Sequence, residues 1–568
     1  MNLGEGSGFL ILENMQYALD RGAKIYGEIL GFGMSNDAYH NSAPDISGRG
    51  QALAMSRALS NSNVSPSDIS YINAHGTGTI ANDASETKAM YRVFNESISQ
   101  IGVSSTKSMV GHCLGAAGII EVIASILCAR NRFYPPTAGF KDQREGCTLD
   151  YIPDTGRTWD GNRTFMKNSF AFGGNNVSII IANEYDKYRE TSISRDLHND
   201  EICISGCGII SPAGVGIQPL INAVQKKKNC YNDDLCLNGQ HIKAARIENS
   251  VIKDIDRRLD LRNIDAASRF AAIAAKSAIQ ESHYPERKKA LSNLGLYLGI
   301  ASGSTFTESE YISALIRDNF QLSRIQNFPA IVPNSVSGNV CRILGIRGHN
   351  SMFCGGHHCG VMNLGFAVSA INAGHTDSML CGASDELLPH SISPKKTNSC
   401  ENQDTIHCTG ESTDAGGAAI GEGAVLFLLE KKAVLTARGV KPIATICGMA
   451  FSSDCENMQS PDEVRTNLKR TIHDAIKFSG ISKDDIHCVC CETKNTPVMK
   501  ILENLFYLQD IRYIDVSHYV GFSESCSALM SIAYSLYHSQ LGNRGNKNYI
   551  LSVFSSQEGN NSVLVLKQ

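Results

Sequence analysis

The chain has 568 residues, which is too long for one ordinary domain and suits two or three. Apolar residues make up 42% and charged residues 19%, a composition typical of globular proteins with large cores. The formal net charge of −4 provides no basic face, so the composition argues against nucleic-acid binding.

Cysteine usage and the opening residues indicate the compartment. The 19 cysteines are scattered without the spacing of a disulfide framework. The first residues lack the basic and then apolar start of a secretory signal peptide, and no apolar run has the length of a membrane span. These features predict a reduced, cytoplasmic protein with no membrane span, whose cysteines are mostly small buried hydrophobic residues.

The first part of the chain alternates short strands with helices. The glycines of Gly4–Gly6 predict a turn, and the run Phe9–Leu12 predicts a buried strand. A short helix over Tyr17–Arg21 should stop at Gly22, because glycine readily adopts the left-handed conformation that ends many helices. The further predicted elements are strands at residues 25–33, 69–73 and 177–182 and helices at residues 48–59 and 114–128.

A polar stretch separates this part from a second one. Residues 183–200 lack periodicity, and we assign residues 186–200 as a linker. A new apolar run begins at Ile202 and predicts an opening strand. The second part then continues through a strand and turn at residues 296–303, a helix at residues 360–373 and the segment at residues 377–382.

The two parts repeat one another. Gly4–Gly6 recurs as Gly421–Gly423, and Glu13 and Arg21 recur at the same offset as Glu430 and Arg438. Internal repetition on this scale indicates two copies of one fold. The first copy, residues 1–185, begins where the second copy, residues 201–568, is already past its midpoint. The sequence therefore predicts half a unit followed by a complete unit.

Two histidines and a lysine lie among glycines and small residues in the first copy. His75 follows the strand at residues 69–73, His112 precedes the helix at residues 114–128, and Lys107 lies between them. We expect the two histidines to face one cavity from two walls. Neutral imidazoles there can donate hydrogen bonds to a developing oxyanion or move protons near neutral pH. Either histidine alone would more often be an ordinary turn residue.

Together these motifs resemble the C-terminal half of the β-ketoacyl-acyl-carrier-protein synthases, the condensing enzymes of the thiolase-like superfamily, and most closely the type II elongating synthases. The family's His-Gly-Thr-Gly-Thr histidine, Ser-Thr-Lys lysine and Gly-His-x-x-Gly-Ala-Ala-Gly histidine correspond to His75, Lys107 and His112, and Asn168–Asn176 also agrees. The resemblance implies an α/β, thiolase-like layered αβαβα fold, with one half-unit and one complete unit. It also implies decarboxylative Claisen condensation of malonyl-carrier protein with an acyl chain in fatty acid, polyene or polyketide synthesis. Acyl carrier protein is then a partner, and no cofactor is implied.

By the same resemblance, the second copy is catalytically degenerate. Family members carry a cysteine at a helix N-terminus that accepts the acyl chain. At the nucleophile, first-histidine, lysine and second-histidine positions, this copy has His357, Glu492, Ser517 and Phe522. A phenylalanine cannot donate to an oxyanion, and a carboxylate opposes a developing negative charge. The second copy thus resembles the chain-length-factor type of ketosynthase-like partner.

Two cysteines near His357 leave alternatives open. Cys359 lies two residues from the nucleophile position, whereas acyl transfer needs reacting atoms within about 3–3.5 Å, so we expect it to be inert. Cys354, His357, His358 and Cys359 could instead bind zinc, but this short pattern has no second ligand pair at the usual spacing.

The missing half of the first copy implies a partner. An isolated half would expose apolar helix and sheet faces, which need a cover. We expect a ketosynthase polypeptide to supply the N-terminal half with its cysteine. The alternative is a non-catalytic ketosynthase-like pseudoenzyme or truncated scaffold. Thiolytic degradation, the other reaction of the superfamily, is disfavoured because the thiolase motifs are absent.

Overall fold

The computed structural model describes residues 2–183, 200–237, 240–253, 255, 259–262, 264–301, 305–317, 331–387, 419–453, 461–492, 496–507, 511–538, 548–556 and 559–568. The chain divides into two compact units. Unit 1 is Met1–Arg195 with Arg347–Asn350, and unit 2 is Asp196–Ile346 with Ser351–Gln568. Residues 186–199 of the predicted linker lie outside the described residues, and the predicted domain boundaries stay a prediction.

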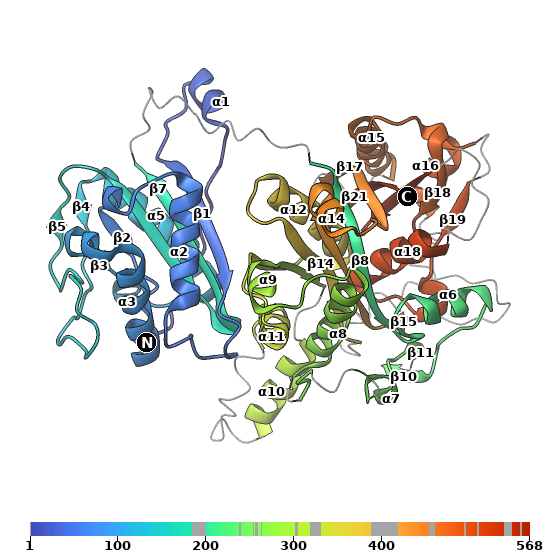
Figure 1. The fold of residues 1–568 in the computed structure, drawn as a ribbon, viewed down its shortest axis with the longest axis horizontal. Coiled ribbons are helices and arrows are strands. Elements are labelled where there is room, and N and C mark those ends of the chain that lie inside the picture. The colour runs from blue at the N-terminus through green and yellow to red at the C-terminus, as the bar shows by residue number, and fades with distance from the viewer. Residues whose placement is uncertain are drawn as a thin grey trace. The chain divides into compact units, whose positions relative to one another are not determined.

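Unit 1 is built on one sheet with the strand order β1-β7-β6-β2-β3 (Figure 1). β1, β7 and β6 pair antiparallel, whereas β6, β2 and β3 pair parallel. The strands of unit 1 are β1 (Glu28–Asn36), β2 (Tyr71–Asn73), β3 (Gly102–Ser104), β6 (Thr164–Phe170) and β7 (Asn175–Ala182), with a separate pair β4 (Phe133–Tyr134) and β5 (Arg157–Thr158). Its helices are α1 (Met15–Asp20), α2 (Arg49–Ser62), α3 (Ile80–Phe94), α4 (Lys107–Val110) and α5 (Ala117–Arg130).

Alternate residues along these strands bury opposite faces of the sheet. Ile72 and Met166 pack with α2 and α3 on one face, whereas Tyr71 and Phe165 pack with α5 on the other. The side-chain period of two in a strand produces this separation. Trp159 closes the α5 side, and its indole N–H donates to Ser70 Oγ at 3.1 Å. The histidine- and lysine-bearing loops lie at the ends of strands that this core holds in place.

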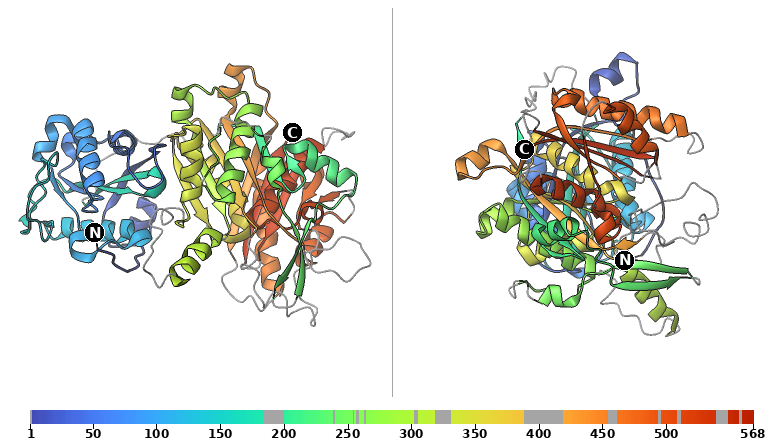
Figure 2. Two further views of the ribbon diagram at one scale, coloured as in Figure 1. Left: turned by 90° about the horizontal axis from the view of Figure 1, so that it is seen from below. Right: turned by 90° about the vertical axis from the view of Figure 1, so that its right-hand side faces the viewer.

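Unit 2 contains a longer sheet with the order β13-β12-β14-β16-β8-β17-β21-β20-β18-β19. Figure 1 labels β14, β8, β17, β21, β18 and β19 of this sheet, and Figure 2 shows its strands from two further sides. These strands are β8 (Ile202–Ser211), β12 (Gly295–Ile300), β13 (Asn350–Cys354), β14 (Ser378–Asp385), β16 (Gly423–Lys431), β17 (Ala444–Ser453), β18 (Ile486–Cys490), β19 (Arg512–Ile514), β20 (Tyr549–Ser555) and β21 (Asn560–Lys567). Shorter strands are β9 (Gly214–Val215), β10 (Asp233–Leu237), β11 (Gln240–Ala245) and β15 (Ile420–Gly421).

The helices of unit 2 cover and separate the two halves of this sheet. They are α6 (Ile217–Gln225), α7 (Asn249–Lys253), α8 (Ala266–Glu281), α9 (Lys288–Asn293), α10 (Thr305–Arg317), α11 (Ser335–Leu344), α12 (Cys359–Asn372), α14 (Lys432–Arg438), α15 (Pro461–Ser479), α16 (Thr496–Leu505), α17 (Ser517–Val520) and α18 (Glu524–His538). α8 and α11 pack outside the β12–β8 half, and α15 and α16 pack outside the β17–β19 half.

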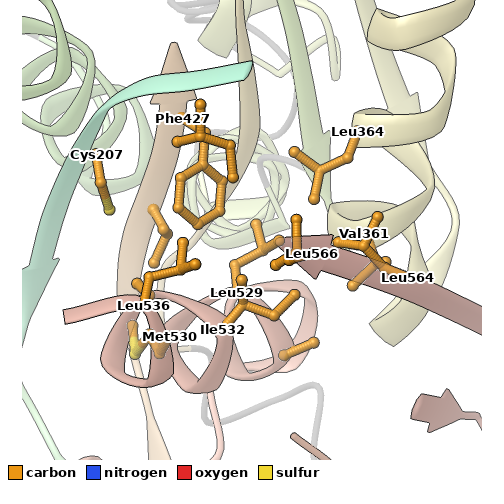
Figure 3. Close-up of a cluster of buried hydrophobic side chains, with 14 of the residues drawn as sticks. Cys207, Val361, Leu364, Phe427, Leu529, Met530, Ile532, Leu536, Leu564 and Leu566 are labelled. Carbon is orange, nitrogen blue, oxygen red and sulfur yellow. The ribbon is translucent and has the colours of Figure 1, made fainter. Parts of the chain in front are cut away.

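The helices α12 and α18 form the middle layer of unit 2. They share one apolar core with both halves of the sheet, in which Val361 and Leu364 of α12 and Leu529 of α18 meet Phe427 of β16 and Leu564 of β21 (Figure 3). Helix, sheet, helix, sheet and helix thus follow one another, which matches the predicted layering. Such layering lets every sheet face bury its apolar side chains.

Unit 1 repeats the second half of unit 2 in structural detail. Its strand order matches that of β17-β21-β20-β18-β19. Tyr71 pairs with Gly102 in unit 1, as Cys488 pairs with Arg512 in unit 2. The first strand of each carries an irregularity in the same register, at Gly31 and at Gly448. The repeat inferred from glycines and charged residues is therefore a repeat of registers as well.

The prediction of a buried strand at Phe9–Leu12 is wrong. These residues form no strand, and Phe9 and Ile11 are 91% and 88% exposed. Their equivalents in unit 2, Leu426 and Leu428, are fully buried in β16, which lies between β14 and β8. A strand needs backbone partners at its edges, and the described part of unit 1 contains no counterpart of β14 or β8.

The close approach of α2 to β1 gives a stability prediction. A methyl group on Gly33 would come within 2.1 Å of the Ala54 carbonyl oxygen and 2.4 Å of the Ala58 nitrogen. We expect Gly33→Val to lower the free energy of unfolding of unit 1 by about 1–3 kcal/mol, because helix and strand must separate. Denaturant unfolding followed by fluorescence of Trp159, the single tryptophan, measures this. Gly115→Ala, which meets no atom within 4 Å, is the control and should leave the midpoint unchanged.

Candidate active site

The structure brings His75 and His112 together. Their ring centroids lie 5.6 Å apart, and the ring planes stand at 84°. His75 lies just beyond the end of β2, and His112 lies in the turn before α5. Phe170, at the end of β6, packs against His75 with ring centroids 5.8 Å apart. The expectation that a strand end and a helix start present two imidazoles to one place is fulfilled geometrically.

The backbone at His75 is held by a buried carboxylate. Glu86 of α3 accepts hydrogen bonds from the backbone N–H groups of His75 at 2.8 Å and Gly76 at 2.9 Å. Gly76 has a φ of +45°, and a Cβ there would come within 2.5 Å of Ser105. Glycine is thus required at this turn both for its φ and for the close approach.

His112 is fixed by short backbone contacts on both sides. Its N–H donates to the carbonyl of Asn2 at 2.8 Å, and its carbonyl accepts from Gly4 at 3.1 Å. Its ring Nδ1 accepts from the backbone N–H of Leu114 at 3.1 Å. A neutral imidazole that accepts at Nδ1 carries its proton on Nε2. His112 therefore presents a hydrogen-bond donor at Nε2.

Lys107 is buried in a charged cluster that the sequence did not predict. Its Nζ lies 2.6 Å from Glu121 Oε1, and Nζ of Lys167 lies 2.7 Å from Glu121 Oε2. All three side chains are almost completely buried. One signal for Glu121 existed, because it is the single charged residue within the apolar run at residues 114–128.

Burial and neighbouring charges shift the ionisation of the site. Burial lowers the pKa of Lys107 to about 8, and repulsion by Lys167 adds to the effect. Burial, followed by the charge of Lys107, lowers the pKa of His75 well below its ordinary value, and the same two causes lower that of His112. Both imidazoles are therefore neutral at pH 7, the form that can both donate and accept.

The second copy repeats the backbone of this site with different side chains. Phe522 bridges to Ile420 just as His112 bridges to Leu3. α17 begins at Ser517 where α4 begins at Lys107. Ser517 Oγ donates to Asp515 Oδ1 at 2.6 Å. Glu492 is partly buried and follows β18.

His357 lies in the turn before α12, directly against Phe522. The two ring centroids are 4.9 Å apart. His357 Nδ1 lies 2.6 Å from Glu524 Oε2, at the start of α18. The His357 ring and its contact with Glu524 thus occupy the turn that precedes α12. His357 therefore lies beside Phe522, the residue that corresponds to His112.

The cysteines near His357 differ in exposure. Cys359 is fully buried, and burial followed by the charge of Asp385 raises the pKa of its thiol to about 12. Cys354 is exposed. Among the described residues, which include Cys354, His357, His358 and Cys359, no group of three or more His, Cys, Asp or Glu side chains is placed to hold a metal ion. The zinc alternative therefore has no geometric support.

Comparison with known proteins identifies the family. A model of the β-ketoacyl synthase C-terminal domain matches residues 26–141, and a model of the β-ketoacyl synthase N-terminal domain matches residues 199–434. The chain belongs to the β-ketoacyl synthase family. The order of the two matches confirms a C-terminal half followed by a unit that starts afresh. The predicted α/β, thiolase-like layered fold is likewise confirmed.

Curated relatives match about a third of the chain. The 3-oxoacyl-[acyl-carrier-protein] synthase 2 of Vibrio harveyi is 46% identical over 180 residues, covering 32% of this chain and 43% of the relative. That of Synechocystis sp. is 47% identical over 179 residues, with coverage of 32% and 43%. Nodulation protein E of Rhizobium leguminosarum bv. trifolii is 44% identical over 179 residues, with coverage of 32% and 44%. The chain thus spans less than half of the length of these relatives.

Solved structures share the fold at low identity. The PfaC keto synthase-chain length factor superposes with a TM-score of 0.78 at 18% identity, covering 97% of this chain and 63% of that one. The ishigamide ketosynthase/chain length factor superposes with a TM-score of 0.56 at 18% identity, covering 65% and 99%.

No helix among the described residues combines the length and apolar character needed to cross a bilayer.

The difference between Cys354 and Cys359 can be measured by alkylation. At pH 7.5 we expect iodoacetamide to modify Cys354 and to leave Cys359 unmodified, because the Cys354 thiol is exposed whereas the Cys359 thiol is buried. Peptide mass spectrometry of the native chain checks this. Labelling in urea should modify both residues. Rapid native modification of Cys359 would contradict the assignment of an inert thiol.

Proposed function

We propose that unit 1 provides the histidine and lysine half of a β-ketoacyl synthase active site. His75 and His112 stabilise negative charge on oxygen, and Lys107 sets the electrostatics around them. The perpendicular imidazole pair carries this proposal, because both rings are neutral and His112 presents its Nε2 donor. Preorganised donors of this kind stabilise developing oxyanions.

The proposed reaction is a decarboxylative Claisen condensation. A malonyl unit on acyl carrier protein loses CO₂, and the electron pair left behind forms an enolate whose oxygen accepts hydrogen bonds from the histidines. The enolate carbon attacks the carbonyl of an acyl chain held as a cysteine thioester. A carbon–carbon bond forms, the carbon–sulfur bond breaks, and the thiolate is released. The product belongs to fatty acid, polyene or polyketide synthesis.

The cysteine comes, in this proposal, from the N-terminal half of a ketosynthase polypeptide. Unit 2 supports the placement, because its own α12 turn brings His357 against Phe522, the equivalent of His112. A cysteine in the same turn of a supplied half would lie beside His112. No described cysteine of unit 1 occupies such a turn, since Cys113, Cys128 and Cys147 lie elsewhere.

The docking surface for that half is the segment Gly6–Asn14. Its equivalent in unit 2, β16, hydrogen-bonds to β14 on one side and β8 on the other. Along β16, Leu426 and Leu428 face α8, whereas Phe427 and Leu429 face the middle layer. A ketosynthase N-terminal half contains the counterparts of all these elements. It would turn the exposed segment into a central strand.

Unit 2 is proposed to act as a chain-length-factor-like partner. His357 with Glu524 fills the nucleophile turn, and Phe522 replaces a donor by a hydrocarbon ring. Such a subunit supports its active partner without condensing anything itself. The cytoplasmic location stays a prediction from composition.

Docking predicts opposite outcomes for equivalent residues. We expect Phe9→Asp and Ile11→Asp to leave the melting temperature unchanged, because both side chains are exposed, but to abolish co-purification with a ketosynthase N-terminal half. Leu426→Asp should instead unfold unit 2, because it buries an unpaired charge. Tyr17→Asp, at an exposed residue of α1, is the matched control. Undiminished co-purification of Phe9→Asp would contradict this docking mode.

Condensation by the reconstituted complex tests the catalytic roles. We expect His75→Ala or His112→Ala to reduce the rate of β-ketoacyl product formation on the order of 100–1000-fold, because each removes a donor to an oxyanion. Glu492→Ala, at the equivalent of His75 in unit 2, should leave it unchanged. Product is followed by mass spectrometry of acyl carrier protein. Equal losses at both positions would refute the division of labour, and a complex without any activity would favour the scaffold alternative.

A further inference from the structure

A buried cluster of two lysines around one carboxylate lies next to the histidine pair. Lys107 Nζ lies 2.6 Å from Glu121 Oε1, and Lys167 Nζ lies 2.7 Å from Glu121 Oε2. The side chains of Lys107, Lys167 and Glu121 are 5%, 1% and 1% exposed. Buried lysines are rare unless paired, and here two of them share a single partner.

Three separate elements hold this cluster in place. Lys107 begins α4, Glu121 lies in the second turn of α5, and Lys167 lies in the middle of β6. The Lys167 ammonium also donates to the carbonyl of Asn168 and to Ser169 Oγ, the latter at 3.3 Å. Lys167 is therefore anchored by its own strand as well as by Glu121.

Three charged groups act on the Lys107 ammonium. Lys167 repels its ammonium, whereas Glu121 and Glu86 attract it. Glu86 is already committed to the backbone N–H groups of His75 and Gly76. The charge of Lys107 also contributes to lowering the pKa of His75 and that of His112. Burial lowers the pKa of Lys107 to about 8, and repulsion by Lys167 lowers it as well, while the two carboxylates oppose the shift.

The fold itself does not require these charges. In unit 2 the positions equivalent to Lys107, Glu121 and Lys167 are Ser517, Ser531 and Ser552. The surrounding elements α17, α18 and β20 form nonetheless, and the Val516 N–H donates to Ser531 Oγ at 3.3 Å. In unit 1 the buried cluster occurs together with the two histidines. In unit 2, where Glu492 and Phe522 replace those histidines, the three equivalent positions hold serines. Burying these charges costs desolvation free energy, and the fold forms without them in unit 2. The cluster therefore indicates a role in the site rather than in folding.

We propose that Lys167 is a positioning residue for Lys107. By taking one oxygen of Glu121, it confines the Lys107 ammonium to the other oxygen and weakens its hold on the proton. The charge facing His75 and His112 is then adjustable near neutral pH. The use of that charge rests on the proposed condensation, whereas the coupling between Lys167 and Lys107 does not.

The coupling is tested by titrating Lys107 directly in the full chain. Lysine labelled with ¹³C at Cε gives one signal per residue, and Lys107→Arg identifies that of Lys107 by its disappearance. We expect a midpoint near pH 8 in the unmodified chain. Lys167→Ser, which installs the residue of unit 2, should raise the midpoint by about one to two pH units, because a like charge is removed. Glu121→Gln should lower it, because an attracting charge is removed.

Opposite shifts by the two variants are a signature that a merely structural role would not give. Lys276→Ser is the matched control, because Lys276 is also buried but pairs with Glu286 in unit 2. It should leave the Lys107 midpoint unchanged. Trp159 fluorescence verifies folding of unit 1, and Lys167→Met, which removes the charge but keeps most of the side-chain length, replaces Lys167→Ser if that variant fails to fold. An unchanged midpoint in the folded variants would overturn the proposal, as would titration of Lys107 at an ordinary lysine pH in the unmodified chain. These results hold whether or not condensation is observed.

Discussion

An inner strand of a sheet depends on hydrogen-bonding neighbours at both edges, and this requirement governs the whole molecule. β16 of unit 2 has β14 and β8 beside it, so its apolar residues are buried and its backbone is paired. Unit 1 carries the same kind of residues at Phe9–Leu12, yet they stay exposed and without strand structure. Even the charged pair is repeated, since Glu13 with Arg21 is exposed where Glu430 with Arg438 is largely buried. The two units thus differ in whether neighbouring strands pair with this segment.

The two units also separate the chemistry. Unit 1 keeps two neutral imidazoles with a buried lysine, and unit 2 keeps the turn at the start of α12. That turn is occupied by His357 paired with Glu524, and a phenylalanine ring replaces the second histidine. The corresponding positions of the two units therefore carry different side chains on the same backbone.

The backbone of the site is repeated in both units, whereas its side chains differ. The bridge between Leu3 and His112 has its counterpart between Ile420 and Phe522, and the short helices α4 and α17 occupy the same place in the repeat. A cluster of Lys107, Glu121 and Lys167 and a set of three serines are both compatible with that backbone. Packing and strand register thus fix where His75, Lys107, His112 and their equivalents lie, whereas the buried charges influence which protonation states these residues adopt.

The sequence by itself determined the duplication, because glycines and charged residues recur in it at one constant offset. Its resemblance to the β-ketoacyl synthases predicted the layered fold, and the strand end and helix start that carry His75 and His112 predicted that the two rings lie together. The same resemblance led to the altered positions His357 and Phe522, whose rings the structure places in contact. Only the tertiary structure decided that Glu121 and Lys167 join Lys107, since three elements distant in sequence must meet to bury them. It also decided that Phe9–Leu12 forms no strand, because the apolar pattern of a segment records what it can bury, while its neighbours decide whether it does.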